Sequence, residues 1–180
     1  HIAKTAGTSI NYIFRRYYGA SLMACRYRKG AEQQSYSRVN LVNDLKYFGN
    51  CLCISGHCLR PWVDYGDFED NLQRIIFVRE PEKRFLSLYI HEQTGKDARY
   101  HMDLIDWARK YNRRNGMVQY IAGEQSVQKA IDILEAKKIH VGVQSQYDES
   151  LRQIKKVMRL DGFDLSNQKK KMEVRDSSLK

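Results

Sequence analysis

Small and hydroxylated residues lead directly into a helix-like pattern at the start of the chain, over residues 1–9. Backbone N–H groups in such a turn can point at one anion, and the dipole of the following helix adds a positive field. Lys4 adds a point charge, and further donors come from the hydroxyls of Thr5, Thr8 and Ser9. The segment predicts an anion-binding loop. It is not a Walker A loop, because Lys4 precedes Gly7, and a capped helix beside a lysine is the alternative interpretation.

A second candidate group follows the apolar run at 75–78, which is typical of a buried parallel strand. Ligands of open α/β sheets bind beyond the carboxyl ends of the strands. Arg79 lies at that position and can make bidentate contacts to a phosphate. Ser87 falls two turns into the helix that Pro81 should begin. Taken alone, Arg79 and the neighbouring glutamates also fit a surface ion-pair network.

A histidine follows the other short apolar run, which covers residues 51–54 and is predicted to be a strand that ends at Ser55 and Gly56. Imidazole has an ordinary pKa close to neutrality, so His57 is a candidate general base. Glu80 is a reserve candidate, with an ion pair to Arg79 or Arg84 as its alternative role. The alternative for His57 is a histidine packed beside a loop.

Helix-like and strand-like patterns alternate along the chain, which predicts an α/β fold with a central parallel sheet. Helices are expected from Gly7, at 41–48, from Pro81, at 101–114, at 126–138 and at 151–158. Strands are expected at 51–54, 75–78 and 139–143, and one more immediately before His1. Thr8 and Ser9 are the expected N-caps of the first helix. Residues 20–37 are expected to be a loop, the chain 1–180 a single domain, and its tail 166–180 partly flexible.

The first two segments together resemble the donor-binding motifs of sulfotransferases. Lys-Thr-Ala-Gly-Thr-Ser at 4–9 is similar to their 5′-phosphosulfate loop. Arg79-Glu-Pro followed by Ser87 is similar to their 3′-phosphate segment, which is usually Arg-Asp-Pro with a serine at that spacing. The form His-x-x-Lys-Thr-Ala-Gly-Thr-Ser is most similar to the Golgi-type glycan branch that includes heparan sulfate 2-O- and 6-O-sulfotransferases. Weaker similarity continues through 115–123 and 141–151.

This resemblance implies a three-layer α/β/α fold related to nucleotide kinases and a 3′-phosphoadenosine 5′-phosphosulfate (PAPS) donor. It implies that the 5′-phosphate and sulfate are held by Lys4, Thr5, Ala6, Gly7, Thr8 and Ser9. It assigns the 3′-phosphate to Arg79 and Ser87, and the role of base to His57. Lys4 would also stabilise charge on the leaving phosphate oxygen. The expected acceptor is a hydroxyl, with a carbohydrate favoured, and no metal is expected because the loop amides and Lys4 supply the positive field.

The charge balance is compatible with this reading and with others. The chain has 31 Lys and Arg against 21 Asp and Glu, a net charge of +10, which favours anionic partners. A non-enzymatic basic domain that binds nucleic acid or acidic glycan is one rival, because tyrosines and arginines alternate at 15–18 and 26–28. A phosphate-loop kinase is another, although neither a Walker A loop nor an acidic metal ligand after a strand is present.

Cysteines and hydropathy bear on the compartment. The four cysteines are too few for a disulfide framework, so a reducing cytoplasm is favoured, with the Golgi lumen as the alternative if an N-terminal anchor has been removed. A zinc site is a weaker alternative, because its ligands would have to be Cys51, Cys53, His57 and Cys58. Their spacing is not that of a standard zinc finger. No apolar run is long enough for a membrane span.

Overall fold

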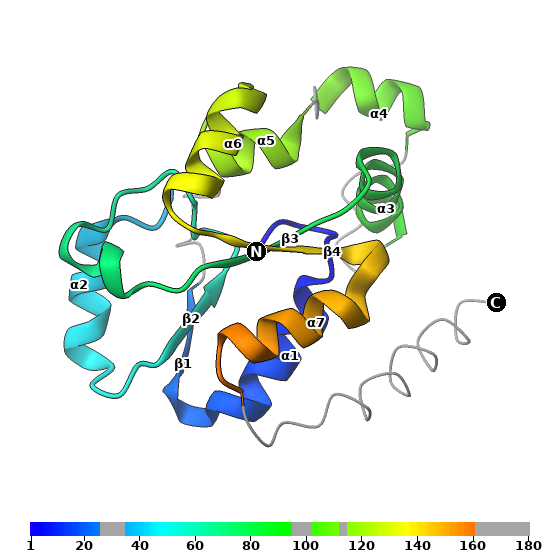
Figure 1. The fold of residues 1–180 in the computed structure, drawn as a ribbon. Coiled ribbons are helices and arrows are strands. Elements are labelled where there is room, and N and C mark those ends of the chain that lie inside the picture. The colour runs from blue at the N-terminus through cyan, green and yellow to red at the C-terminus, as the bar shows by residue number, and fades with distance from the viewer. Residues whose placement is uncertain (26–34, 95–101, 112–114, 161–180) are drawn as a thin grey trace.

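A computed structural model describes residues 1–25, 35–94, 102–111 and 115–160 of the chain (Figure 1). The helices are α1 (Gly7–Tyr18), α2 (Arg38–Tyr47), α3 (Pro81–Thr94), α4 (Leu104–Tyr111), α5 (Gly116–Ala122), α6 (Val127–Ala136) and α7 (Tyr147–Val157). The strands are β1 (Leu22–Cys25), β2 (Cys53–Gly56), β3 (Ile75–Val78) and β4 (His140–Val143). Short 3-10 helices cover Gly19–Ser21, Gly66–Asn71 and Gln144–Gln146. The expected tail at 166–180 and the tyrosine–arginine stretch at 26–28 lie outside the described residues.

The strands form two parallel pairs. β1 pairs with β2, with Leu22 opposite Cys53, and β3 pairs with β4, with Ile75 opposite His140. The mixed α/β class with parallel strands is therefore as expected. The expected single central sheet is not: among the described residues the strands make two two-stranded sheets, and β2 and β3 are not hydrogen-bonded to each other.

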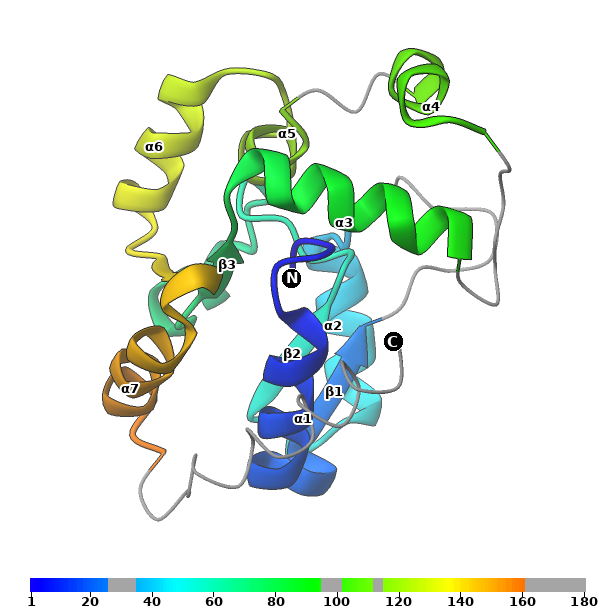
Figure 2. The same ribbon diagram turned by 90° about the vertical axis from the view of Figure 1, so that its right-hand side faces the viewer.

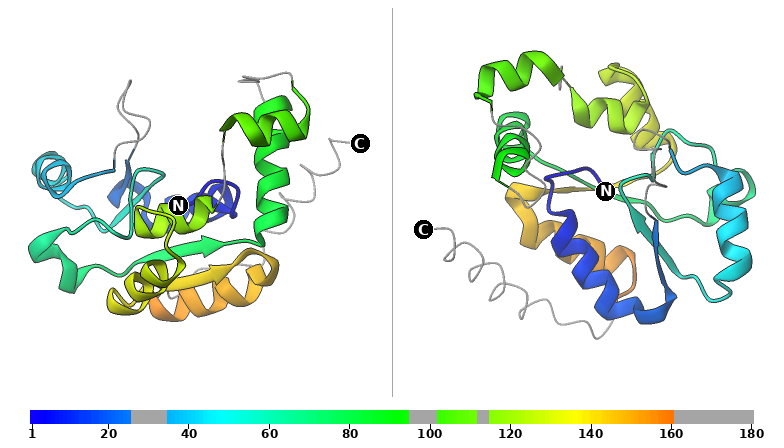
Figure 3. Two further views of the ribbon diagram at one scale, coloured as in Figure 1. Left: turned by 90° about the horizontal axis from the view of Figure 1, so that it is seen from above. Right: turned by 180° about the vertical axis from the view of Figure 1, so that it is seen from behind.

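Helices cover both faces of the β3–β4 pair, as Figure 3 shows. Phe77 of β3 packs with residues of α1 and α7, including Ile13 and Leu151. Ile76, the preceding residue, packs on the opposite side with residues of α5 and α6, such as Ile121 and Ala130. This alternation follows from the period-two geometry of a strand, and it explains why β3 is apolar throughout. A third cluster joins β1 to Leu41 of α2.

The first β pair corrects two expectations. Leu22–Cys25 is a strand, although residues 20–37 were expected to be a loop. β2 begins at Cys53 rather than Cys51, and it includes the Ser-Gly pair that was expected to end it. The reason is the close approach of the two strands: a Cβ at Gly56 would overlap the carbonyl oxygen of Cys25. The glycine therefore permits strand pairing here instead of breaking the strand.

The helices fall close to their expected positions, with three differences. α1 has Ala6 at its N-cap in a left-handed conformation and no side-chain cap, so Thr8 and Ser9 lie inside the first turn. α5 was not expected from the sequence. α4 and α6 are shorter than the segments 101–114 and 126–138, and residues 101 and 112–114 lie outside the described chain. α2, α3 and α7 match the predicted apolar spacing.

One disulfide joins Cys25 to Cys58. Cys25 is the last residue of β1 and lies opposite Gly56 in the register, so the parallel pairing brings the two cysteines together. The bond closes a loop between residues 33 positions apart, which stabilises a fold by about 3–4 kcal/mol in the chain-entropy account. Cys51 and Cys53 are free thiols. Within the described part of the chain, none of the helices has the length and hydropathy that a membrane span requires.

Candidate functional site

The loop that precedes α1 has an unusual backbone. Lys4 and Ala6 have φ angles of 65° and 73°, in the left-handed region that non-glycine residues rarely occupy. The fully buried Thr5 lies between them, and its hydroxyl donates a hydrogen bond of 3.0 Å to the carbonyl oxygen of Ile2. Each left-handed residue costs of order 1–3 kcal/mol, and such strain concentrates at functional sites.

Two arginines tie this loop to the α3 side of the molecule. Nε of Arg84 donates to the carbonyl oxygen of Ala3 at 3.1 Å, and a guanidinium N–H of Arg79 donates to that of Lys4 at 3.4 Å. Figure 2 shows α3 crossing close to the N-terminal loop. The strained backbone is therefore held by contacts from a segment some eighty positions away in the sequence.

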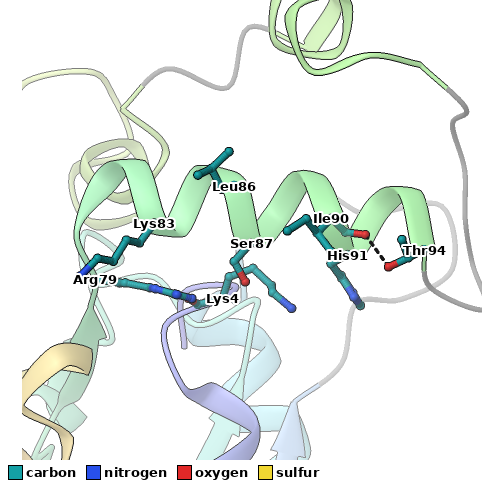
Figure 4. Close-up of a pocket in the computed structure, with 8 residues that line it drawn as sticks. All are labelled: Lys4, Arg79, Lys83, Leu86, Ser87, Ile90, His91 and Thr94. Carbon is teal, nitrogen blue, oxygen red and sulfur yellow. Dashed lines mark hydrogen bonds between the residues drawn. The ribbon is translucent and has the colours of Figure 1, made fainter. Parts of the chain in front are cut away.

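A pocket of about 450 Å³ lies along α3 where the loop meets it (Figure 4). Lys4, Arg79 and Ser87, three of the residues predicted from the sequence, all line this pocket. In Figure 4 the Ser87 hydroxyl and the side chains of Lys4 and Arg79 lie on the same side of α3. The remaining lining residues are Lys83, Leu86, Ile90, His91 and Thr94.

Lys83 and His91, which also line the pocket, were not among the binding residues predicted from the sequence. The signal was present in the sequence. Lys83, Ser87 and His91 are spaced four residues apart, which places them on one side of the helix that begins at Pro81, and Arg79 precedes this helix at the same interval. Once Arg79 and Ser87 are assigned to one ligand, the two positions with the same spacing belong to the same surface.

The pocket gathers positive charge. Burial lowers the pKa of Lys4, and the neighbouring Arg79 guanidinium lowers it further. Among the described residues, Nε of Arg79 is buried and has no hydrogen-bond partner. Lys83 is 3.8 Å from Glu80, a distance that leaves its charge only partly compensated. An anion in the pocket would relieve the repulsion between the cations and give the buried Nε a partner.

The other predicted loop residues do not line this pocket. The Thr5 hydroxyl donates to Ile2, so its proton is not available to a ligand, contrary to the expectation that it adds a donor. Ser9 lies in the first turn of α1 and interacts with Tyr147 of α7. Thr8 is exposed. A Cβ at Gly7 would overlap the His1 ring, so glycine is required there by close packing.

His57 lies on the other side of the loop, beside His1, and it does not line the α3 pocket. The two imidazole rings are 3.8 Å apart, and Nδ1 of His57 is 2.8 Å from the carbonyl oxygen of His1. Because a carbonyl only accepts, Nδ1 carries the proton of the neutral ring and Nε2 carries the lone pair. Burial, together with the positive charge of Arg60, lowers the pKa of His57 to about 4.

This pKa modifies the expectation of a base close to neutrality. His57 is neutral at pH 7 and has the lone pair a base needs, but it is a weaker base than an ordinary imidazole. Glu80, the reserve candidate, is also a weaker base than an ordinary carboxylate, because its pKa is lowered. The causes are a hydrogen bond from its own backbone amide and one from the Ser145 side chain.

A hydrogen-bond network holds the His1 ring in place. The Asn11 side chain, one turn into α1, contacts Nε2 of His1 at 3.0 Å, and the Ser55 hydroxyl donates to the Asn11 side-chain oxygen. Ser55 belongs to β2, so the network links β2, α1 and the start of the chain. His57 was identified from the sequence as a candidate base, but His1, Asn11 and Ser55 were not identified as partners of a base.

The zinc alternative does not fit the arrangement of its ligands. Cys58 is bonded to Cys25, so it cannot supply a thiolate. Across the described ranges, no group of three or more His, Cys, Asp or Glu side chains is placed to hold a metal ion.

In comparisons with known proteins, no family model, no curated protein and no solved structure matches the chain.

Proposed function

We propose that this protein is a PAPS-dependent sulfotransferase that transfers a sulfuryl group to a hydroxyl of a carbohydrate acceptor. The observation that carries the proposal is the convergence of Lys4, Arg79 and Ser87 on one pocket. They come from distant parts of the sequence and match the donor motifs of sulfotransferases in order. A doubly phosphorylated nucleotide also suits the charge of the pocket, because Arg79 offers a buried donor that has no partner among the described residues.

In the proposed reaction the bond between sulfur and the donor phosphate oxygen breaks as a bond from sulfur to the acceptor oxygen forms. The Lys4 ammonium stabilises the negative charge left on the phosphate. His57 takes the acceptor proton on Nε2, which its hydrogen bond to His1 keeps as the lone-pair nitrogen. The acceptor hydroxyl approaches from the His57 side of the loop, since His57 lies outside the α3 pocket.

Two coarser features agree with the proposal. The parallel α/β arrangement is compatible with a three-layer sulfotransferase fold, although the sheet is divided into two pairs. The Cys25–Cys58 disulfide favours an oxidising compartment such as the Golgi lumen over the cytoplasm that composition favoured. Carbohydrate sulfation would be consistent with such a compartment.

Calorimetric titration with 3′-phosphoadenosine 5′-phosphate, the desulfated donor, tests the donor site, with ATP and AMP as competing ligands. We expect micromolar, selective binding that weakens about tenfold or more in Lys4→Ala and in Arg79→Lys, because each variant loses a contact to a charged group. Lys46→Ala, an exposed lysine in the last turn of α2, is the matched control and should bind as wild type.

The negative outcomes separate the rival functions. Absence of binding by folded protein, or undiminished binding by Lys4→Ala, would overturn the proposal. Preference for ATP would favour a phosphate-loop kinase, and heparin binding without nucleotide binding would favour a basic polyanion-binding domain. If the nucleotide binds, transfer of radiolabelled sulfate to desulfated glycans tests the chemistry. His57→Ala should abolish that transfer without weakening nucleotide binding.

A further inference from the structure

An exposed tryptophan lies in a turn that follows His57 closely in the sequence. Trp62 is 42% exposed, whereas its neighbours Pro61 and Val63 are buried. The backbone N–H of Val63 donates to the carbonyl oxygen of Arg60 at 3.2 Å, which closes a turn with proline in the position that proline favours. The turn therefore directs the indole toward the surface while the residues on either side anchor the backbone.

One face of this indole is backed by the protein. A Cβ at Gly123 would lie 3.2 Å from Cδ2 and Cε2 of Trp62, the two atoms that the fused rings share. The bond between these atoms can be approached only from above or below the ring plane, so the Gly123 backbone lies against one ring face. Gly123 also caps the C-terminal end of α5 with a φ of 78°, a conformation that favours glycine. The exposed part of the ring is therefore its opposite face and its edge.

Contacts on both sides of the turn fix its position. Before the turn, Cys58 is bonded to Cys25 of β1. After it, Nζ of Lys137 donates to the carbonyl oxygen of Val63 at 2.7 Å. An aromatic ring that is already held in place loses little conformational freedom when a ligand packs on it. The Trp62 indole is therefore positioned in advance of any ligand.

Arg60 lies between Trp62 and the candidate base along the same loop. Its guanidinium is 4.3 Å from the centroid of the Tyr120 ring in α5, and the Tyr120 hydroxyl donates to the carbonyl oxygen of Leu59. The positive charge of Arg60 is close enough to His57 to lower the pKa of that imidazole. The loop therefore follows α5 and places a candidate base, a cation and an open ring face in that order. We call His57, Arg60 and Trp62 the acceptor row.

An open indole face and a neighbouring guanidinium together suit an acidic sugar. One face of a sugar ring presents C–H hydrogens, which carry partial positive charge and pack on the negative face of an aromatic ring. A guanidinium has five N–H donors in its plane, so stacking on Tyr120 does not use them, and it binds a carboxylate or sulfate in a bidentate manner. The nearest acidic residues in the sequence already have partners: Asp64 accepts from the amide of Gly66, and Glu124 pairs with Lys129 at 3.2 Å. The row therefore favours an anionic sugar over a neutral one.

Single-stranded nucleic acid also stacks on aromatic rings, but the acceptor row suits it less well. Such ligands place successive bases on successive exposed rings. The second aromatic ring beside the row, Tyr120, is buried and lies beneath Arg60. One open ring beside one cation fits a single acidic sugar unit better than a run of bases.

We propose that Trp62 and Arg60 form a binding subsite for an acidic sugar unit of the acceptor, adjoining the unit whose hydroxyl reaches His57. This inference rests on the proposed function, because His57 enters it as the base that receives the acceptor proton. The sugar ring stacks on Trp62, and its carboxylate or sulfate accepts hydrogen bonds from Arg60. The subsite holds the acceptor in place and takes no part in the sulfuryl transfer itself.

The test is NMR titration of the full chain with two acidic hexasaccharides, one of galacturonate and one of alternating glucuronate and N-acetylglucosamine. The chain has two tryptophans, and Trp107 is fully buried with its indole N–H donated to Glu92. The indole N–H signal of Trp62 should therefore shift as the sugar binds, while that of Trp107 stays in place. Trp62→Ala should weaken binding in calorimetry by about tenfold or more. Tyr47→Ala, at an exposed aromatic residue of α2, is the matched control and should bind as wild type.

Carboxyl-reduced forms of the same hexasaccharides test Arg60. Wild type should bind them more weakly than the acidic forms, and Arg60→Gln should bind both forms alike. Three results would overturn the proposal in protein whose Trp107 signal shows that it is folded: no shift at Trp62, undiminished binding by Trp62→Ala, or equal binding of both sugar forms by wild type. Tighter binding of a thymidine hexanucleotide than of either sugar at Trp62 would also overturn it, because the ligand is then a nucleic acid.

Failure of this inference and failure of the proposed function give different results. If 3′-phosphoadenosine 5′-phosphate binds in the α3 pocket but neither sugar shifts the Trp62 signal, the acceptor subsite alone is wrong. If the sugars bind and the nucleotide does not, the sulfotransferase proposal is wrong and Trp62 is not an acceptor subsite. If both bind, Trp62→Ala should raise KM for the acceptor about tenfold and leave kcat within about twofold of wild type, because a subsite remote from the reacting atoms contributes uniform binding.

Discussion

The two sides of the loop at residues 4–7 differ in charge: cationic side chains gather on one side, and a neutral histidine lies on the other. On the α3 side, Lys4 and Arg79 are crowded into an open pocket, where their mutual repulsion favours an anion. On the other side, His57 is held neutral at pH 7, with its pKa lowered to about 4. In the proposed sulfuryl transfer, the difference would separate two tasks: one side would bind a negative ligand, and the other would hold a proton acceptor in its uncharged form.

The supports of the two sides are also different. The α3 side depends on a helix whose back is packed by aromatic rings, because Trp107 of α4 contacts Phe85 and Tyr89 at centroid distances of 5.1 and 5.6 Å. The histidine side depends on the close approach of Gly7 to the His1 ring and on the Asn11 contact. A substitution among the supports of one side therefore does not touch the residues of the other side.

The largest effect is expected from Trp107→Ala. Trp107 is fully buried and donates to Glu92 of α3 at 2.9 Å. Its removal should lower the free energy of unfolding by about 3–5 kcal/mol, and it should weaken nucleotide binding in the α3 pocket. Urea denaturation and calorimetry measure the two quantities, and the NMR titration of His57 should not move. Trp62→Ala, at a partly exposed tryptophan, is the control; an equal loss in both variants would contradict a specific support of α3.

Gly7→Ala should perturb the opposite side. The new Cβ overlaps the His1 ring, so the ring or the first turn of α1 must shift, at a cost of about 1–3 kcal/mol in the free energy of unfolding. The NMR signals and titration of His57 should change, since its ring is in contact with His1. Gly49→Ala, where a Cβ meets nothing within 4 Å, is the matched control. If Gly7→Ala and Gly49→Ala have equal free energies of unfolding, the contact between Gly7 and His1 does not contribute to stability.

The sequence predicted the α3 side better than the histidine side, for a physical reason. Arg79, Ser87 and the strand before them lie on one strand–helix unit, where spacing along the chain determines position in space. The helical periods of α1, α2, α3 and α7 were readable for the same reason. Lys83 and His91 lie four residues before and after Ser87, so the same spacing identifies them from the sequence.

The histidine side depends on contacts between distant segments, which periodicity does not report. The rings of His57 and His1 are in tilted contact although the two residues lie 56 positions apart in the sequence. The pairing of β1 with β2 needed a strand at Leu22–Cys25 that was not expected. The same pairing brings Cys25 to Cys58. The left-handed conformations of Lys4 and Ala6 were equally hidden, because neither residue is a glycine. The division of the sheet was also not predictable from patterns within single strands.

A smaller effect on the α3 side is expected from Ser87→Ala. Loss of one hydroxyl that contacts a ligand costs about 0.5–1.5 kcal/mol, so the affinity for 3′-phosphoadenosine 5′-phosphate should fall up to about tenfold. Thr94→Ala is the matched control in the same pocket, because the Thr94 hydroxyl already donates to the carbonyl oxygen of Ile90 at 2.7 Å. Equal affinity in both variants would remove Ser87 from the binding site and leave Lys4 and Arg79 as its only predicted members.

The smallest effect concerns pH and returns to the histidine side. Because folding lowers the pKa of His57 from 6.5 to about 4, the unfolded chain binds a proton at this residue between those pH values and the folded chain does not. The stability that His57 contributes is therefore present above pH 6.5 and is lost as the pH falls toward 4. The loss is smaller than the pKa shift alone would give, because His57 is exposed over much of its surface although its ring lies against His1, and solvent screens part of its charge. Urea midpoints measured across this range should fall less steeply in His57→Gln than in wild type. His91→Gln, on the α3 side, is the control. If the urea midpoint falls equally steeply with pH in the two variants, the group whose protonation is suppressed by folding is not His57.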